Sequence, residues 1–157
     1  MNFQAVLFDL DGTLADTAPD LGAALNRLLQ EEARLPLPLA TTRPHTSNGT
    51  RGLIRIGFDL GPEDPAYADL ARRFLDHYAA FICEQTVLFP GVAELLDTLD
   101  ARGIRWGVVT NKPQRFTRPL LDALALTSRC ACSISGDSTP HPKPAPDPLL
   151  LGCQHAA

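Results

Sequence analysis

The fold class of this chain is decided by a run near its N-terminus, Phe3-Gln4-Ala5-Val6-Leu7-Phe8-Asp9-Leu10-Asp11-Gly12-Thr13. Residues 3–10 are almost all apolar, and an apolar run of this length is typical of a strand buried on both faces, as in a parallel sheet covered by helices. The run stops at Asp11-Gly12-Thr13, where the glycine lets the chain turn sharply. We therefore expect a first strand with two carboxylates, Asp9 and Asp11, at its carboxyl end.

The segment that follows has a helical rather than a strand pattern. Leucines from Leu21 to Leu29 form a helical stripe that begins at Pro19-Asp20, with Asp20 as a plausible helix cap. A second amphipathic helix is expected over about residues 65–85. Residues 34–48 carry three prolines and are expected to form a loop rather than regular structure. Residues 17–86 are therefore predicted to be a helical insertion.

After Phe89-Pro90-Gly91 the chain returns to alternating helices and strands. A helix is expected to close at Gly103, where a left-handed residue ends it. A strand over 104–110, a helix over 116–124 and a short strand over 130–135 follow. This order predicts a parallel, right-handed α/β sheet with helices on its faces. We expect an α/β core of residues 1–16 and 87–157, interrupted by the insertion.

Composition and charge exclude several classes of protein. Fourteen Lys and Arg against eighteen Asp and Glu give a net charge of −4, which argues against a nucleic-acid partner. No apolar stretch approaches the roughly 20 residues of a membrane-spanning helix, and the N-terminus lacks a secretory signal, so a cytoplasmic protein without a membrane partner is expected. The four cysteines and four histidines lack the spacings of metal or redox motifs.

Polar residues follow each predicted strand, where ligands bind in parallel α/β sheets. Asp9 and Asp11 follow the first strand, Thr110-Asn111 the second, and Lys143 lies in the loop after the third. Two aspartates two residues apart often have only a turn or capping role. However, a charge at the end of a buried strand costs several kcal/mol unless it is compensated, and Mg²⁺ is a natural compensation.

Three motifs occur in order: Phe8-Asp9-Leu10-Asp11-Gly12-Thr13-Leu14-Ala15-Asp16, Val108-Val109-Thr110-Asn111-Lys112-Pro113 and Lys143-Pro144-Ala145-Pro146-Asp147-Pro148. At these residues the chain resembles the haloacid dehalogenase superfamily of phosphotransferases, over nearly its whole length. The resemblance implies a Rossmann-like core with an inserted helical cap, residues 17–86. Within the superfamily the chain is similar to bacterial phosphoglycolate phosphatases and N-acetylmuramic acid 6-phosphate phosphatases, and the residues around Trp106 favour the second group.

By this resemblance, Asp9 is the nucleophile that becomes an aspartyl phosphate. Asp11 protonates the leaving group and then activates water. Asp9 through its side chain and Asp11 through its backbone carbonyl would bind Mg²⁺. Thr110 and Asn111 would bind the phosphoryl oxygens, and Lys143 would offset charge on the nucleophile and transition state. For Lys143, the alternative is a solvated loop lysine.

Substrate choice is expected to come from the cap, where residues 47–51 resemble the loop that these phosphatases lower onto the site. Asn48, Gly49 and Arg51 are therefore candidate substrate-binding residues, and so is Lys112. Arg51 could pair with a substrate carboxylate or could only mark the start of a helix. For Lys112, it is equally open whether the side chain contacts substrate. The sequence does not select between phosphoglycolate and a phosphosugar.

The sequence departs from the family at its fourth motif, an acidic pair after a further strand, which is not found. We therefore expect the C-terminal part of the core to be missing and the first strand to lie at an edge. With fewer ligands, Mg²⁺ is expected to bind weakly, so that the 157-residue chain itself is inactive and tends to associate.

The expected function is a magnesium-dependent phosphatase of carbohydrate metabolism that acts on a small phosphorylated metabolite. The first candidate substrate is 2-phosphoglycolate, hydrolysed through an aspartyl phosphate. One alternative is a phosphatase for N-acetylmuramic acid 6-phosphate or another phosphosugar. The alternative from another class is a non-catalytic, truncated remnant that binds phosphate weakly. The sequence does not indicate an oligomeric state.

Overall fold

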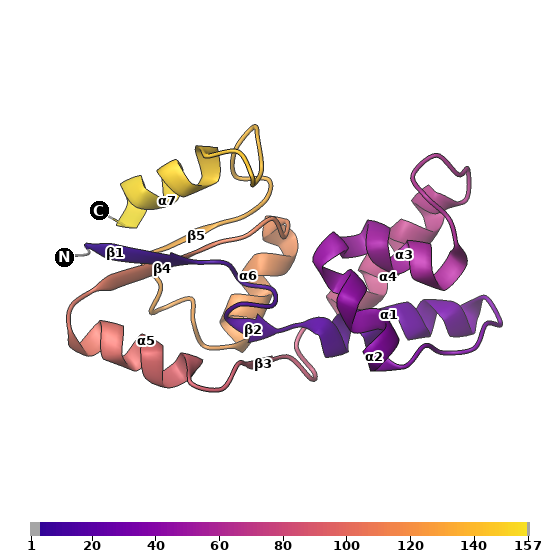
Figure 1. The fold of residues 1–157 in the computed structure, drawn as a ribbon, viewed down its shortest axis with the longest axis horizontal. Helices are drawn as coiled ribbons and strands as arrows, with labels where there is room; N and C mark the ends of the chain where they lie inside the picture. Colours follow the sequence, from indigo (N-terminus) through magenta and orange to yellow (C-terminus); the bar gives the residue numbers. More distant parts are fainter. Residues whose placement is uncertain (1–3, 157) are drawn as a thin grey trace. The chain divides into compact units, whose positions relative to one another are not determined.

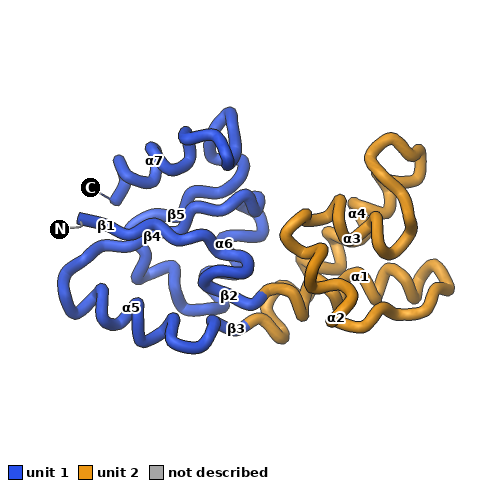
Figure 2. The backbone as a smooth tube through the Cα atoms, viewed as in Figure 1, with its two compact units in different colours: residues 1–16, 87–157 blue, residues 17–86 orange. Residues whose placement is uncertain are grey.

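The computed structural model describes residues 4–156 of the chain, which divide into two compact units (Figure 2). Unit 1 consists of residues 1–16 and 87–157, and unit 2 of residues 17–86. The chain leaves unit 1 after its first strand and turn, completes unit 2, and then returns. Unit 2 is therefore an insertion between two segments of unit 1.

Unit 1 is built on a three-stranded parallel sheet (Figure 1). Its strands are β1 (Ala5–Phe8), β4 (Arg105–Val109) and β5 (Cys132–Ile134), in the order β1-β4-β5. Because the strands are parallel, Asp9 after β1 and Thr110 after β4 come to the same edge of the sheet. The predicted parallel α/β fold is confirmed.

The described part of unit 1 also contains three helices, of which the first and last pack on the sheet: α5 (Val92–Ala101), α6 (Gln114–Ala123) and α7 (Asp147–Ala156). Figure 1 shows α7 on one face of the sheet and α5 on the other. The two-residue strands β2 (Ala15–Asp16) and β3 (Val87–Leu88) pair antiparallel where the chain leaves and re-enters unit 1. Both faces of the sheet are thus covered, as the order of elements predicts.

The first strand differs from the expectation of a strand buried on both faces. All four residues of β1 are half-buried, whereas β4 is buried from Trp106 onward. The reason is that, within residues 4–156, β1 pairs with β4 alone and so lies at an edge of the sheet. The predicted strand also included Phe3, which lies outside the described residues.

The connection from α5 to β4 is fastened by Asp100. Trp106 Nε1 donates a hydrogen bond to Asp100 Oδ1 at 2.8 Å, and Arg129 lies 2.7 Å from Asp100 Oδ2. Hydrogen bonds from Arg129 and then from Trp106 hold the pKa of Asp100 below its ordinary value. The helix closes at Gly103 with φ +66°, as the sequence predicts.

Unit 2 is helical. Its longer helices are α1 (Ala18–Glu31), α3 (Gly49–Phe58) and α4 (Tyr67–Ala80). Their apolar stripes meet in a core that buries Leu21, Leu25, Leu28, Leu29, Leu53, Ile54, Phe58, Leu70, Phe74 and Tyr78. The helix predicted over 65–85 is shorter in the structure, where α4 begins at Tyr67 and ends at Ala80.

Residues 34–48 were expected to form a loop, and this prediction is wrong for residues 39–48. They contain α2 (Leu39–Thr42) and a 3₁₀ helix, η1 (Arg43–Asn48). Pro44 lies in the first turn of η1, where a proline needs no backbone donor. The prolines therefore begin short helices here instead of preventing them.

Asp20 was expected to cap α1, and the structure corrects this. Its carboxylate is 2% exposed and accepts hydrogen bonds from both the backbone N–H and the hydroxyl of Thr86, at 2.8 and 2.6 Å. The N–H of Gln85 also donates to it, at 3.0 Å. Asp20 thus ties the start of α1 to the last residues of unit 2, a contact across more than sixty residues that no local pattern reveals.

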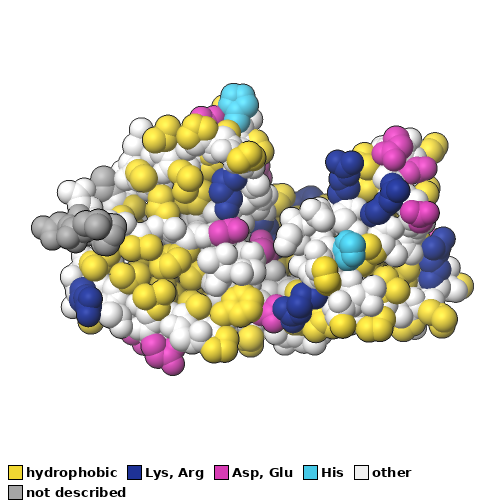
Figure 3. Space-filling view, viewed as in Figure 1, with side chains coloured by type: hydrophobic (Ala, Val, Ile, Leu, Met, Phe, Trp, Pro, Cys, Tyr) yellow, Lys and Arg dark blue, Asp and Glu magenta, His cyan; other side chains and the backbone are white. Residues whose placement is uncertain are grey.

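No helix in the described part of the chain is long and apolar enough to cross a membrane. On the face of the molecule drawn in Figure 3, Lys and Arg side chains are interspersed with Asp and Glu. This distribution agrees with the small net charge of −4.

Candidate active site

The loop after β1 presents two carboxylates on either side of a buried leucine. Leu10 is fully buried, and its carbonyl accepts hydrogen bonds from the N–H groups of Leu14 and Ala15 at 3.1 and 3.0 Å. The tight turn is completed by Gly12, whose φ of +77° suits glycine. Asp9 and Asp11 remain accessible, with 44% and 31% of their side chains exposed. The turn therefore holds both carboxylates at the edge of the sheet.

Lys143 joins the third motif to the first. Its Nζ lies 2.9 Å from Asp9 Oδ1 and donates a hydrogen bond to the carbonyl of Val109 at 2.8 Å. Lys143 is thus anchored at the end of β4 and directed at the carboxylate that follows β1. The alternative of a lysine surrounded by solvent does not describe this geometry.

The second motif contributes Thr110 and Asn111 to the site. Thr110 is buried, and its hydroxyl oxygen accepts a hydrogen bond from the N–H of Lys112 at 3.1 Å. The side-chain amide of Asn111 donates to the carbonyl of Lys143 and accepts from its N–H, each at 2.9 Å. Asn111 therefore holds the backbone of Lys143 in place, a contribution that sequence reasoning missed.

Lys112 contacts the second carboxylate. Its Nζ lies 3.1 Å from Asp11 Oδ1, and only 8% of its side chain is exposed. The prediction that Lys112 contacts substrate stays a prediction. The structure brings Asp9, Asp11, Thr110, Asn111, Lys112 and Lys143 together in unit 1, at the carboxyl ends of β1 and β4 and in the loop after β5.

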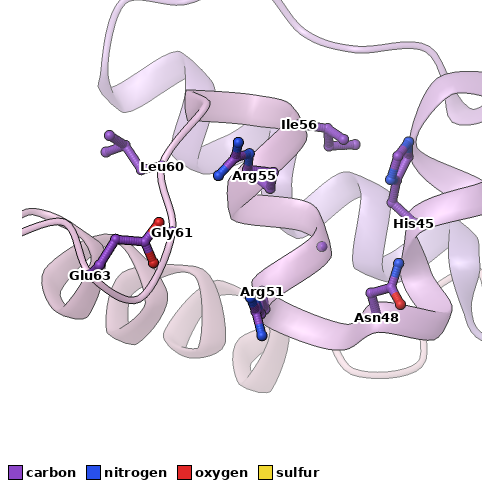
Figure 4. A pocket seen from close by; sticks show the side chains of 9 residues that line it. His45, Asn48, Arg51, Arg55, Ile56, Leu60, Gly61 and Glu63 are labelled. Atoms are coloured by element: carbon purple, nitrogen blue, oxygen red, sulfur yellow. The ribbon is translucent and has the colours of Figure 1, made fainter.

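The remaining candidate residues lie in unit 2. Asn48 and Arg51 line a groove of about 510 Å³ along the exposed side of α3 (Figure 4), and Gly49 is the first residue of that helix. The groove is also lined by residues that sequence reasoning did not single out as binding residues, among them His45, Arg55 and Glu63. The four-residue spacing of Arg51 and Arg55, which puts both on one helix face, was the signal available for the second arginine.

The described residues 4–156 contain no group of three or more His, Cys, Asp or Glu side chains arranged to hold a metal. Burial raises the pKa of the Cys130 and Cys132 thiols, so both stay protonated and are poor metal ligands. Oxygen donors around Asp9 and Asp11 are the better candidates. Mg²⁺ is commonly held by one or two carboxylates together with waters and substrate phosphate oxygens, and this donor set fits that pattern.

Comparisons with known proteins identify a matching family and similar proteins. A family model described as haloacid dehalogenase-like hydrolase matches residues 3–156. The chain is 39% identical over 154 residues to an N-acetylmuramic acid 6-phosphate phosphatase from Pseudomonas putida, covering 98% of this chain and 69% of that protein. It is 44% identical over 153 residues to a phosphoglycolate phosphatase from Xylella fastidiosa, covering 96% of this chain and 66% of that protein.

Among solved structures, the chain is similar to a predicted phosphoglycolate phosphatase from Haemophilus somnus, with a TM-score of 0.83 and 29% identity. That match covers 97% of this chain and 71% of the other. The chain thus spans about two thirds of the length of the curated relatives it matches.

Proposed function

The chain belongs to the haloacid dehalogenase-like hydrolases, and we propose that it contains the active site of a magnesium-dependent phosphatase for small phosphate monoesters. The observation that carries the proposal is the contact of Lys143 Nζ with Asp9 Oδ1 at 2.9 Å. This contact places a cation beside an accessible carboxylate at the end of a strand, where a phosphoryl group would need both a nucleophile and a positive charge.

In the proposed reaction, Asp9 attacks phosphorus in line and displaces the alkoxide of the substrate. The new bond joins a carboxylate oxygen of Asp9 to phosphorus, and the bond from phosphorus to the ester oxygen breaks. Asp11 gives its proton to the leaving oxygen, and then takes a proton from the water that hydrolyses the aspartyl phosphate. Lys143 and the hydroxyl of Thr110 stabilise the charge on the phosphoryl oxygens, and Asn111 contributes to the same oxygens while it holds Lys143.

Mg²⁺ would be held by the side chain of Asp9 and the backbone carbonyl of Asp11, with water and phosphate oxygens as further ligands. When bound, it offsets the negative charge of the phosphate next to the nucleophile. Asp9 then serves both as ligand and as nucleophile, which is why a carboxylate with nearly half of its side chain exposed suits this position.

The organic part of the substrate is proposed to be selected by unit 2, acting as the cap. The groove along α3 contains Arg51, Arg55 and His45 against one acidic side chain, Glu63, so it favours an anionic group. Its volume of about 510 Å³ lies in the range of small-molecule sites. We propose 2-phosphoglycolate as the substrate, because a relative with 44% identity is named phosphoglycolate phosphatase. Its carboxylate suits the cationic groove, as does the carboxylate of N-acetylmuramic acid.

A second candidate is N-acetylmuramic acid 6-phosphate or another phosphosugar. The similarity to the Pseudomonas putida protein, 39% identical over 98% of this chain, favours it. Parallel assays with phosphoglycolate, N-acetylmuramic acid 6-phosphate and common sugar phosphates would separate the two, because the true substrate should have a much higher kcat/KM than the others.

The proposed function is tested at Asp9 in a protein that also carries the fourth motif, because the 157-residue chain by itself is expected to be inactive. Asp9→Asn keeps the shape of the side chain but removes the nucleophile, so phosphate release should fall below about a thousandth of the unsubstituted rate. Asp122→Asn removes an exposed carboxylate from α6 and serves as the matched control, with turnover unchanged. Substantial turnover by Asp9→Asn would reject the nucleophile. No magnesium-dependent release by the same protein without the substitution, with the fourth motif present, would favour the non-catalytic alternative.

A further inference from the structure

The side chain of Lys112 is unusually buried for a lysine. Only 8% of it is exposed, and its Nζ lies 3.1 Å from Asp11 Oδ1. Lysine is rarely buried unless its charge is paired, because removing an ammonium from water is costly. The ion pair with Asp11 therefore accounts for the position of this cation.

The backbone of Lys112 is held from three directions. Its N–H donates to the hydroxyl oxygen of Thr110 at 3.1 Å, at the end of β4. Its carbonyl accepts from the N–H of Gly136 at 2.9 Å, in the loop after β5, and from the hydroxyl of Thr117 at 3.0 Å, in α6. Because its backbone is held in this way, the side chain of Lys112 reaches a well-defined position.

The chain has only two lysines, and each contacts a different carboxylate of the site. Lys143 contacts Asp9, and Lys112 contacts Asp11. The two aspartates therefore have separate cationic partners. This separation matters because the proposed reaction gives them different tasks, attack on phosphorus for Asp9 and proton transfer for Asp11.

We propose that Lys112 is a positioning residue that holds the Asp11 carboxylate where it can transfer a proton to and from the reacting oxygens. Asp11 lies in a turn and is partly exposed, so its contact with Lys112 restricts the rotamers that the carboxylate can adopt. A displacement of about 1 Å at a reacting group can cost roughly a hundredfold in rate. The inference rests on the proposed function because it depends on the role of Asp11.

The test compares two leaving groups in Lys112→Met, again in a protein that carries the fourth motif. This substitution removes the ammonium group and keeps the length of the side chain up to Cε. p-Nitrophenolate leaves without needing a proton, whereas an alkoxide needs one. We expect kcat for an alkyl phosphate to fall about 10- to 100-fold and kcat for p-nitrophenyl phosphate to fall less than about threefold, with little change in KM. Asp11→Asn should show the same leaving-group pattern, only more strongly.

Arg118→Gln is the matched control, because it removes an exposed cation from α6 and should change neither rate. Lys112→Gln is a second variant in case Lys112→Met does not fold. An equal fall for both leaving groups would overturn the inference. A rise in KM with an unchanged leaving-group pattern would also overturn it, and would instead make Lys112 a substrate contact.

A second measurement does not depend on turnover. Crystal structures of the unsubstituted protein and of Lys112→Met should show the Asp11 carboxylate displaced or spread over several rotamers in the variant. An unchanged, well-ordered Asp11 would overturn the inference. If the protein with the fourth motif hydrolyses no phosphate monoester, the proposed function fails, and the position of Asp11 still decides whether Lys112 holds it.

Discussion

Replacing Asp20 with alanine should destabilise unit 2 strongly, although Asp20 lies outside the candidate site. The carboxylate is 2% exposed and accepts hydrogen bonds from Gln85 and Thr86, at the point where unit 2 ends. Asp20→Ala removes the acceptor and leaves its donors in place. The variant therefore tests whether this contact stabilises unit 2.

The size of the effect follows from which donors water can reach. Gln85 is exposed, so its N–H can turn to solvent, whereas the N–H and hydroxyl of Thr86 are buried. Each buried donor left without an acceptor costs about 1–3 kcal/mol. Since a hydroxyl can rotate to another acceptor, we expect a loss of about 3 kcal/mol for Asp20→Ala. For a unit of about 70 residues, this corresponds to a fall of roughly 12–24 °C in Tm.

Thermal unfolding followed by circular dichroism measures the loss, and amide hydrogen exchange locates it. The N–H groups of Gln85 and Thr86 should lose protection in Asp20→Ala. Asp76→Ala is the matched control, because Asp76 is an exposed aspartate of the same unit that pairs with Arg72, and its loss should leave Tm nearly unchanged. A change of less than about 1 kcal/mol in Asp20→Ala, with exchange at Thr86 unaltered, would refute the reasoning.

Two further substitutions test the site and its surroundings. Gly136→Ala would place a Cβ against the backbone carbonyl of Asn111, so we expect the free energy of unfolding in urea to fall by about 1–3 kcal/mol. Arg51→Gln removes a cation from the groove along α3 and should raise KM for 2-phosphoglycolate about tenfold, with turnover of p-nitrophenyl phosphate unchanged. Equal effects on both substrates would mean that Arg51 does not select the organic part.

Much of the fold could be predicted because its signals are local. The apolar run before Asp9 and the strand that ends at Thr110 show their periodicity within a few residues, and parallel strands follow from the order of elements. The errors occurred where tertiary packing decides. Residues 39–48 form short helices although a loop was expected, and the Asp20 carboxylate accepts hydrogen bonds from Thr86 instead of capping α1.

The candidate site was also predicted in part. The residue types and their order could be read from the three motifs, because these resemble the motifs of the haloacid dehalogenase superfamily. The contacts that these residues make with one another could not be predicted from the motifs. Asn111 was predicted to contact phosphate, and its bonds to the backbone of Lys143 depend on a loop 32 residues further on.

The sequence by itself determined the parallel α/β class, the helical insertion and the two aspartates at the end of the first strand, because periodicity and turn chemistry act between neighbouring residues. Only the tertiary structure decided that Lys143 lies on Asp9 and that Lys112 is buried against Asp11. The physical reason is that these features arise between segments about a hundred or more residues apart. Such contacts depend on the register of the strands and the packing of the loops, not on any pattern within one segment.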